Sequence, residues 1–329
     1  MKAAWFERSG KAGDVLIVGD RKKPDPGQGE VRVRLYASGV NPSDVKKRAG
    51  FQPAGLDLTG FVIPHSDGAG VIEEVGAGVA QSRIGERVWV YQAQYQRHQG
   101  TAAEYVCLPQ QTAVRLPDQA DFSIGACIGI PIMTAHRCVF ADGDIKGKTI
   151  LVTGASGRVG HYAVQWAKLF GARVIGTAGN KHRCQLAKDS GADHVFSYKE
   201  TDLADQIMQV TDGEGVDRIV EVEFGDNIET SCQVLKTSGT IASYSSSRDP
   251  EPVLPFYQMM FNNITVKTVL VYNMPEEAKR HAIQDIWRAL ENGQLIHRIA
   301  RRYSLNDIAG AHEAIEEGGM DGCVVVDIE

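Results

Sequence analysis

Short runs of alternating apolar and polar residues fill the first third of the chain. Gly, Pro, Asn and Asp separate them, and the clearest are EVRVRLYASGV (30–40), GAGVIEEVGAGV (68–79), ERVWVYQ (86–92) and AEYVCLP (103–109). A period of two with turn residues between the runs is typical of antiparallel strands. We therefore predict antiparallel or barrel-like β structure for this region.

Near residue 121 the pattern changes to longer helical periods that alternate with short apolar runs. After a helical approach (121–140), we predict strands at 149–154, 173–179, 194–198, 216–223, 240–246 and 263–272. The helices predicted between the first five strands cover 158–172, 182–192, 203–211 and 227–239. An amphipathic helix (276–293) and a final strand (322–329) follow. Strands that alternate with helices indicate βαβ units and a parallel sheet.

Composition narrows the class of protein. The 329 residues are enough for two domains of about 100–200 residues each. The formal net charge of −6 and the lack of a basic stripe argue against nucleic acid as a partner. No apolar run is long enough for a membrane span. The N-terminus has no apolar signal core, so we expect a cytoplasmic protein. The 6 cysteines form no CxxC pair, which argues against a structural zinc lobe and a redox dithiol.

The loop GASGRVG (154–160) lies between a predicted strand and a predicted helix. In that context the backbone N–H groups and the helix N-terminus face a pyrophosphate. Gly157 permits close approach of the backbone, and Gly160 permits close packing of the helix on the sheet. The loop therefore predicts a dinucleotide site.

The end of the second strand of this region indicates which dinucleotide. An NAD site usually has an Asp or Glu there, which accepts from the ribose 2′-OH. Here no acid occurs between Val174 and Arg183, and small residues are followed by Lys181, His182 and Arg183. Space and cations suit a 2′-phosphate. We therefore predict NADPH; the alternative is that these cations are solvated charges of a helix start.

Six motifs together make the chain similar to a known family: GVNPSD (39–44), PHSDGAGVIEEVG (64–76), IGERV (84–88), GIPIMTA (129–135), GASGRVG (154–160) and GTAG (176–179). The chain resembles the zinc-independent medium-chain dehydrogenase/reductases, and most of all the zeta-crystallin type of NADPH:quinone oxidoreductase. The resemblance implies an α/β fold with a GroES-like, partly open β-barrel as catalytic domain (1–122 and 273–329). A Rossmann doubly wound parallel sheet (123–272) would bind NADPH, and the active site would lie in the cleft between the domains.

Zinc-dependent alcohol dehydrogenases share this fold, so their ligand positions were compared. The resemblance aligns the three catalytic ligands with Asn41, Ser66 and Ile130, and His65 stands where the family has a Gly. A catalytic zinc needs three protein ligands at once. The cysteine-rich lobe between Val90 and Ala102 is also missing. We therefore predict no metal.

The resemblance also implies the roles of individual residues. The pyrophosphate would be lined by Ser156, Gly157, Arg158 and Val159, and the 2′-phosphoadenosine end by Gly179, Lys181, Arg183, Tyr198 and, on the adenosine side, Asn227. The ribose and nicotinamide would contact Tyr244, Ser245, Ser246, Ser247, Val269 and Leu270. Asn41 and Thr134 would lie beside the nicotinamide as catalytic residues, with the Asn41 amide near the reacting carbonyl.

Some positions depart from the family. Arg158 replaces a second Gly and either reaches a phosphate or projects into solvent. Lys46 replaces an aromatic residue and would contact phosphate or a polar substrate group. Gln52 replaces a Tyr, the proton donor implied for related enoyl-thioester reductases, which disfavours that activity. Tyr244 and Ser245 replace a Val–Gly pair, which would narrow the nicotinamide site.

Other candidates have structural interpretations. His136 is interpreted as a packed histidine, with a proton relay as the alternative, and Asp44 as a turn cap rather than a catalytic acid. Glu221 and Glu223 are interpreted as structural. The apolar residues at helical spacing are interpreted as core: Val164, Trp166 and Leu169.

The leading hypothesis is an NADPH-dependent reductase of quinones or similar conjugated carbonyls, because a quinone needs little acid–base assistance once hydride is delivered. The alternative is reduction of an activated C=C bond in an enone, enal or 2-haloacrylate. A non-enzymatic NADPH-binding protein with a structural or RNA-binding role is the third hypothesis, and the acidic charge balance argues against RNA. The apolar run 263–272 would lie at a sheet edge, which predicts a homodimer, with a tetramer as the alternative.

Overall fold

The computed structural model describes residues 1–51 and 60–329. The chain divides into two compact units, Met1–Ile130 with Ile283–Glu329 and Pro131–Ala282. We call the first the barrel unit and the second the parallel-sheet unit. The divisions fall inside two helices, α4 (Ile130–Val139) and α10 (Glu276–Glu291), whereas the sequence places the boundaries at 122/123 and 272/273.

The barrel unit is built on a seven-stranded sheet in the order β14-β15-β3-β4-β5-β7, with β6 also paired to β3. All pairs are antiparallel except β14 with β15. The strands are β3 (Glu30–Val40), β4 (Asp67–Val75), β5 (Arg87–Val90), β6 (Tyr105–Pro109), β7 (Ala113–Arg115), β14 (Ile299–Ser304) and β15 (Cys323–Asp327). The long strand β3 pairs with β6 along its first half and with β15 along its second half.

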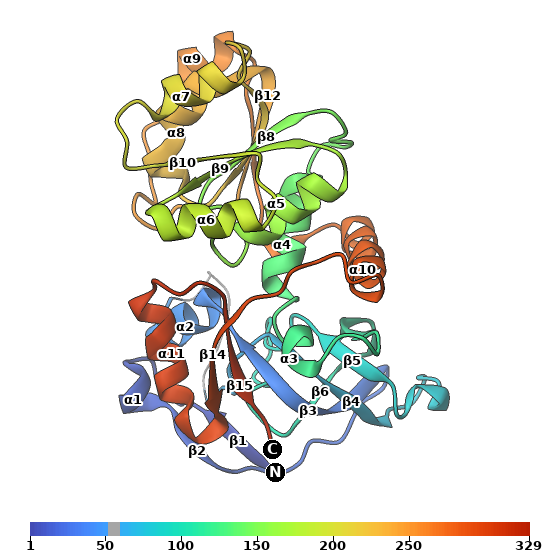
Figure 1. Ribbon diagram of the computed structural model, residues 1–329. Coiled ribbons are helices and arrows are strands. Elements are labelled where there is room, and N and C mark those ends of the chain that lie inside the picture. The colour runs from blue at the N-terminus through green and yellow to red at the C-terminus, as the bar shows by residue number, and fades with distance from the viewer. Residues whose placement is uncertain (52–59) are drawn as a thin grey trace. The chain divides into compact units, whose positions relative to one another are not determined.

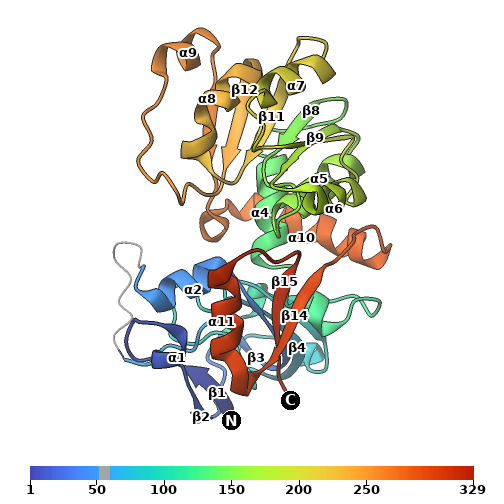
Figure 2. The same ribbon diagram turned by 60° about the vertical axis from the view of Figure 1, so that its left-hand side comes forward.

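Shorter elements close this unit. A two-stranded sheet is formed by β1 (Lys2–Trp5) and β2 (Ile17–Asp20). The helices are α1 (Ala12–Val15), α2 (Pro42–Ala49), α3 (Phe122–Gly125) and α11 (Ile308–Glu317), with 3₁₀ turns at Gln81–Arg83, Gln110–Thr112 and Leu305–Asp307. Figure 2 shows α11 alongside β15 and β14. Inward-facing residues of the alternating runs, such as Val31, Val33 and Leu35, form the core with Ile308 and Val324.

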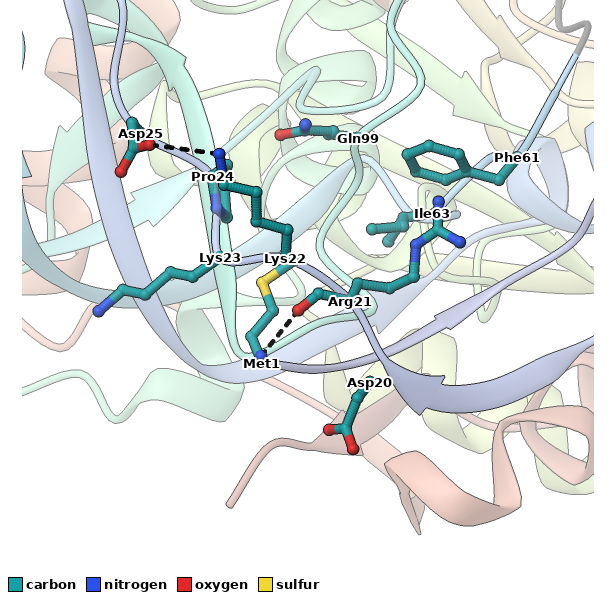
Figure 3. A pocket seen from close by; sticks show the side chains of 10 residues that line it. All are labelled: Met1, Asp20, Arg21, Lys22, Lys23, Pro24, Asp25, Phe61, Ile63 and Gln99. Atoms are coloured by element: carbon teal, nitrogen blue, oxygen red, sulfur yellow. Dashed lines mark hydrogen bonds and ion pairs between the residues drawn. The ribbon is translucent and has the colours of Figure 1, made fainter.

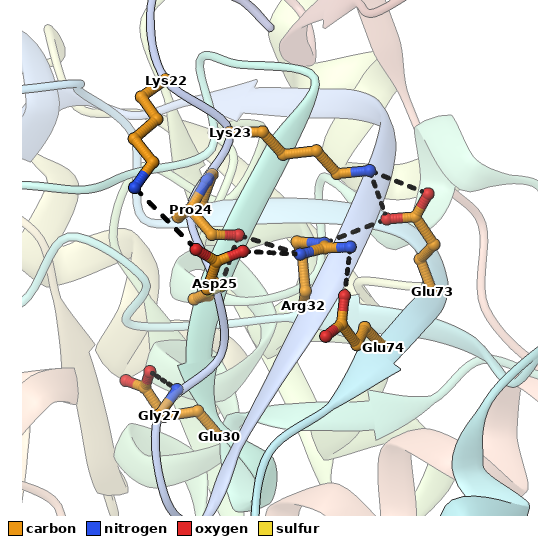
Figure 4. A network of polar contacts seen from close by, with 10 residues as sticks. Lys22, Lys23, Pro24, Asp25, Gly27, Glu30, Arg32, Glu73 and Glu74 are labelled. Atoms are coloured by element: carbon orange, nitrogen blue, oxygen red, sulfur yellow. Dashed lines mark hydrogen bonds and ion pairs between the residues drawn. The ribbon is translucent and has the colours of Figure 1, made fainter.

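The connector between β2 and β3 is held by a buried arginine (Figure 4). Arg32 donates to the carbonyl of Pro24 at 3.1 Å and to Glu73 at 3.0 Å, and it also pairs with Glu74. Lys23 reaches Glu73 at 2.7 Å. Because Arg32 is almost fully buried, its partners offset the desolvation of its charge.

The parallel-sheet unit has six strands in the order β10-β9-β8-β11-β12-β13, all paired in parallel. The strands are β8 (Thr149–Val152), β9 (Arg173–Ala178), β10 (His194–Ser197), β11 (Val216–Glu221), β12 (Leu235–Ser243) and β13 (Thr265–Thr268). The helices are α5 (Gly160–Leu169), α6 (Lys181–Asp189), α7 (Leu203–Val210), α8 (Phe224–Val234) and α9 (Phe256–Phe261), and a 3₁₀ turn covers Val271–Asn273. Figure 1 shows α5 and α6 on one face of the sheet and α7 and α8 on the other.

This is the doubly wound arrangement that the sequence predicts, with three local differences. The helix predicted over 227–239 begins at Phe224 and ends at Val234, because Leu235–Gly239 already belong to β12. The strand predicted over 263–272 is shorter, and β13 ends at Thr268. Leu169 is 40% exposed and therefore not core, whereas Val164 and Trp166 are fully buried. The prediction for Leu169 is wrong because the buried residues of α5 end at Ala167, and Leu169 is the last residue of the helix.

None of the helices in the described part of the chain combines the length and apolar character needed to cross a bilayer.

Candidate active site

The carboxyl edge of the parallel sheet carries most of the predicted cofactor residues. Because all six strands run in one direction, the segments that follow them leave at the same edge. The chain steps outward in opposite directions from β8 and β11, which are neighbours, and ligands of such sheets bind at this switch point. The segment after β8 carries Ser156–Val159, that after β9 carries Gly179–Arg183, that after β12 carries Tyr244–Ser247 and that after β13 carries Val269 and Leu270.

The loop after β8 turns sharply into α5. Gly154 has a φ of +60°, which glycine adopts without strain. A Cβ on Gly160 would lie 2.2 Å from the carbonyl oxygen of Gly154, so only glycine fits the start of this helix. Val159 at the N-cap of α5 makes no side-chain capping hydrogen bond in the described part of the chain. The first N–H groups of α5 therefore suit an anion, as expected for a pyrophosphate site.

The end of β9 brings an aromatic ring and two cations to one place. A Cβ on Gly179 would lie 2.6 Å from the hydroxyl oxygen of Tyr198, so the ring lies directly against this glycine. Asn180 caps α6 by accepting from the backbone N–H of Arg183 at 2.9 Å. Lys181 is exposed and Arg183 is half-buried in the first turn of α6. No carboxylate follows β9 between Gly179 and Arg183.

A buried carboxyl joins the ends of β8 and β11. Oε1 of Glu221 accepts from the Thr153 hydroxyl at 2.8 Å, the Glu223 backbone N–H at 2.6 Å and the Asn227 amide at 2.8 Å. Burial raises the pKa of Glu221 above its ordinary value. Its bonds give Glu221 a structural role, and they engage the Asn227 amide, which the sequence assigns to the adenosine side.

The segment after β12 is tied down by its own serines. The Ser246 hydroxyl accepts from the backbone N–H of Gly225 at 2.9 Å, and the hydroxyls of Ser245 and Ser247 lie 3.1 Å apart. Burial raises the pKa of Tyr244 well above its ordinary value, so the phenol stays neutral. After β13, Val269 is buried and Leu270 is exposed.

Two predicted residues lie on α4. Thr134 is buried. The ring of His136 lies 4.5 Å from that of Phe140 and 5.4 Å, edge-on, from that of Trp166. These contacts support the interpretation of His136 as a packed histidine.

The remaining predicted catalytic residue, Asn41, lies in the barrel unit at the start of α2. Its backbone N–H donates to Oδ2 of Asp44 at 2.9 Å, so Asp44 caps α2, as one of its two interpretations predicts. The Asn41 side-chain amide donates to Oδ2 of Asp67 at 2.9 Å, and the same oxygen accepts from the backbone N–H of Ile130 at 2.7 Å. Asn41 and Asp67 are both buried.

Asp67 is the functional candidate that the sequence analysis missed. Burial raises the pKa of Asp67 from 3.8 to about 8, against the opposing effects of the Ile130 and Asn41 hydrogen bonds. Lys47 is also buried and donates to Gln94 at 2.7 Å. Burial lowers the pKa of Lys47, and the nearby carboxyls of Asp44 and Asp67 oppose that shift. The sequence signal that could have identified Asp67 is an acidic residue within a run of small and apolar residues at the start of β4.

Two of the residues discussed in the sequence analysis remain, Lys46 and Gln52. Lys46 is exposed on α2. Gln52 lies outside the described residues.

Asn41 and Ile130, at two of the ligand positions of zinc dehydrogenases, both bond to Asp67, and His65 is adjacent to the third position, Ser66. His65 has a φ of +76°, the backbone region where the family has its glycine. Its ring nitrogens lie 2.8 Å from the Ser38 hydroxyl and 2.9 Å from Nε2 of His312. Burial lowers the pKa of His65 well below its ordinary value. Within residues 1–51 and 60–329, no group of three His, Cys, Asp or Glu side chains is arranged to hold a metal ion.

A cavity of about 430 Å³ in the barrel unit lies apart from the predicted residues (Figure 3). It is formed at the end of β2, where the Arg21 guanidinium lies 3.6 Å from the centre of the Phe61 ring. Its lining contains Ile63 and Gln99 but none of the residues assigned to the cofactor or to catalysis.

Comparisons with known proteins agree with both units. Residues 27–118 match the alcohol dehydrogenase GroES-like domain family, and residues 159–288 match the zinc-binding dehydrogenase family. Human quinone oxidoreductase is 32% identical over 305 residues, which are 92% of this chain and 90% of that protein. A Burkholderia 2-haloacrylate reductase is 27% identical over 320 residues, 95% of each chain.

Solved structures give the same picture. An NAD-dependent alcohol dehydrogenase superposes with a TM-score of 0.90 at 30% identity, covering 100% of both chains. Escherichia coli quinone oxidoreductase, solved in complex with NADPH, superposes with a TM-score of 0.86 at 25% identity, again over 100% of both chains.

Proposed function

The chain belongs to the medium-chain dehydrogenase/reductase family and is an oxidoreductase; from this premise we propose that it reduces a quinone or similar conjugated carbonyl with NADPH, without a catalytic zinc. The observation that carries the proposal is the carboxyl edge of the parallel sheet. There a glycine loop meets an uncapped helix start, and β9 ends in two cations without a carboxylate.

The residues present fit NADPH. In the loop from Gly154 to Gly160, a Cβ on Gly160 would clash with the carbonyl oxygen of Gly154. Glycine at this position allows the tight turn into α5 that a pyrophosphate-binding loop requires. Lys181 and Arg183 on α6 supply the positive charge that a 2′-phosphate needs, and Tyr198 beside Gly179 supplies an aromatic face for adenine. Ser156 and Arg158 would lie at the pyrophosphate, and Tyr244 to Ser247 with Val269 and Leu270 at the nicotinamide end.

When bound, NADPH supplies the hydride. The chain's own residues would bind and orient the reactants and stabilise the developing charge. Thr134 would contact the nicotinamide, and the Asn41 amide would donate to the substrate oxygen on which negative charge develops. Water can then supply the proton. Because a quinone is already electrophilic, no acid–base triad is required.

The test is a titration with NADPH and, separately, with NADH, followed by addition of 9,10-phenanthrenequinone or 1,4-benzoquinone. Tight NADPH binding, weak NADH binding and quinone turnover would support the proposal. Equal affinity for the two cofactors would remove the 2′-phosphate role of Lys181 and Arg183. The solved NAD-dependent relative makes this control necessary.

Reduction of an activated C=C bond is the second candidate, and the likeness to a 2-haloacrylate reductase favours it. In both reactions hydride addition to the conjugated system leaves negative charge on a conjugated oxygen, so the same Asn41 donor would serve both. Turnover of a quinone, an enone and 2-chloroacrylate at equal NADPH concentration separates them.

We also propose a homodimer formed by the parallel-sheet unit. Strand β13 is the edge of its sheet, and a free edge favours pairing with a second chain. Nearby in sequence, α9 exposes Phe256, Tyr257 and Phe261 by 65%, 69% and 76%, and such a patch marks an interaction surface. Light scattering should give a dimer for the wild type and a monomer for F256E/F261E; a monomeric wild type would remove the idea, and a tetramer would extend it.

A cytoplasmic location stays a prediction.

A further inference from the structure

The group that holds the Asn41 side chain is a buried acid, not a metal or a base. Oδ2 of Asp67 accepts two hydrogen bonds, from the Asn41 amide at 2.9 Å and from the Ile130 backbone N–H at 2.7 Å. A reversed carboxamide would bring the Asn41 oxygen against this oxygen. Asp67 therefore selects one of the two orientations of the amide, with its nitrogen toward β4.

This orientation has a chemical consequence. An amide nitrogen carries two hydrogens, and Asp67 uses one of them. The second remains for another acceptor. Fixing the nitrogen in place thus makes Asn41 a donor of constant direction, which is what stabilisation of a developing oxyanion requires.

Asp67 itself is held from several sides. Thr101 donates its hydroxyl to the Asp67 backbone carbonyl at 2.6 Å, and a Cβ on Gly129 would lie 2.1 Å from Oδ1 of Asp67. Oδ1 is buried, and among residues 1–51 and 60–329 it has no hydrogen-bond partner. A carboxyl with one oxygen satisfied twice and the other buried without a partner fits the neutral acid better than the anion. With the proton on Oδ1, Oδ2 remains the acceptor of both hydrogen bonds.

We propose that Asp67 is a positioning residue of the reductase: its carboxyl fixes the Asn41 carboxamide so that one amide N–H is presented to the substrate oxygen that gains charge. The inference rests on the proposed function. The neutral acid does this without placing a negative charge beside the substrate oxygen. The charged or titratable groups facing Asp67 are Asp44 and Lys47 from α2 and Cys127 from the segment before α4.

The proposal predicts a pH effect that a purely structural role does not. As pH rises through about 8, Asp67 loses its proton, because burial holds its pKa there. The new negative charge would oppose charge on the substrate oxygen, so kcat should fall at alkaline pH. D67N retains an acceptor oxygen for Asn41 and Ile130 but cannot ionise.

The experiment measures quinone turnover from pH 6 to 9.5 for the wild type, D67N and D67A, together with NADPH affinity by fluorescence. We expect D67N to keep most of the activity at pH 7 and to lose the alkaline decline. We expect D67A to lower kcat by about tenfold to a hundredfold, the usual effect of a misplaced catalytic group, with NADPH affinity unchanged.

The outcomes separate the two ideas. Full kcat in D67A, or an alkaline decline unchanged in D67N, would overturn the role of Asp67 while leaving the proposed function intact. A wild type that binds NADPH but reduces neither quinones nor activated alkenes would overturn both. If D67A does not fold, D67N still decides, since its pH profile requires only the folded protein.

Discussion

The candidate residues of the two units are of different kinds. In the parallel-sheet unit the candidate site is mostly backbone: a glycine loop and a helix N-terminus, with one exposed and one half-buried cation on α6. In the barrel unit it is a buried side-chain network, in which Asn41, Asp67 and Ile130 meet from distant parts of the chain. The first kind can be recognised from a local motif, and the second cannot.

The difference also concerns electrostatics. Lys181 of α6 is exposed and Arg183 is half-buried, so water screens their charges, and their role would come from contact with a phosphate. Asp67 is buried, and burying a charge costs free energy. In the proposal, the protonation state of its carboxyl therefore affects the reaction. Four predictions test this contrast.

The largest effect should follow from removing the Asn41 donor. N41A should lower kcat for a quinone by about 10²–10³-fold, the usual result of deleting one oxyanion donor. NADPH affinity should change little, because the residues proposed to contact its phosphates and adenosine belong to the parallel-sheet unit. Steady-state kinetics with a parallel NADPH titration measure both. A kcat within threefold of wild type would mean that Asn41 does not touch the reacting oxygen.

The next effect concerns the cations of α6. K181A and R183A should each weaken NADPH binding by about tenfold, since a hydrogen bond to a charged group contributes on that scale. NADH binding should stay the same. K188A, at the other end of the same exposed helix, is the matched control and should alter neither affinity. Equal losses for NADH would assign these cations to the pyrophosphate or to stability instead.

A third prediction tests the backbone half directly. In G160A the new Cβ would lie 2.2 Å from the Gly154 carbonyl oxygen, so the loop must shift. We expect a loss of about 1–3 kcal/mol in unfolding free energy, typical of overpacking, and weaker NADPH binding. In the control G13A the nearest atom is 3.5 Å away, and stability should be kept. Thermal melting with and without NADPH gives both quantities, and identical melts for the two variants would contradict the assigned close approach.

The smallest effect concerns stability against pH. Burial raises the pKa of Asp67 from 3.8 to about 8, so between these values the folded protein holds a proton that the unfolded chain has lost. Raising the pH through this window therefore favours unfolding. Melting temperatures from pH 5 to 8 should fall less steeply in D67N than in the wild type. If the melting temperatures of D67N and the wild type fall equally with pH, the pKa of Asp67 in the folded protein is not raised.

Most of the fold was predictable because its signals are local. Alternation with a period of two marked the strands of the barrel unit, and the change to strand–helix alternation marked the parallel sheet. The errors occurred where local signals overlap. Within the segment from Leu235 to Gly239, Leu235 pairs with Val216 of β11, and the pairing resumes at Thr240 after an irregularity in the register. Ser238 has a φ of +65°, which a right-handed helix does not allow, so β12 replaces the end of the predicted helix.

The sequence by itself determined the two architectures, the glycine loop and the cationic end of β9, because each depends on neighbours within a few residues. Only the tertiary structure decided what Asp67, Glu221 and His136 do. Glu221 joins two strand ends and His136 packs on aromatic rings. Asp67 keeps its proton and orients Asn41 because folding buries it beside an amide 26 residues away along the chain. Burial and pairing over such separations arise from the packing of strands, which no local pattern encodes.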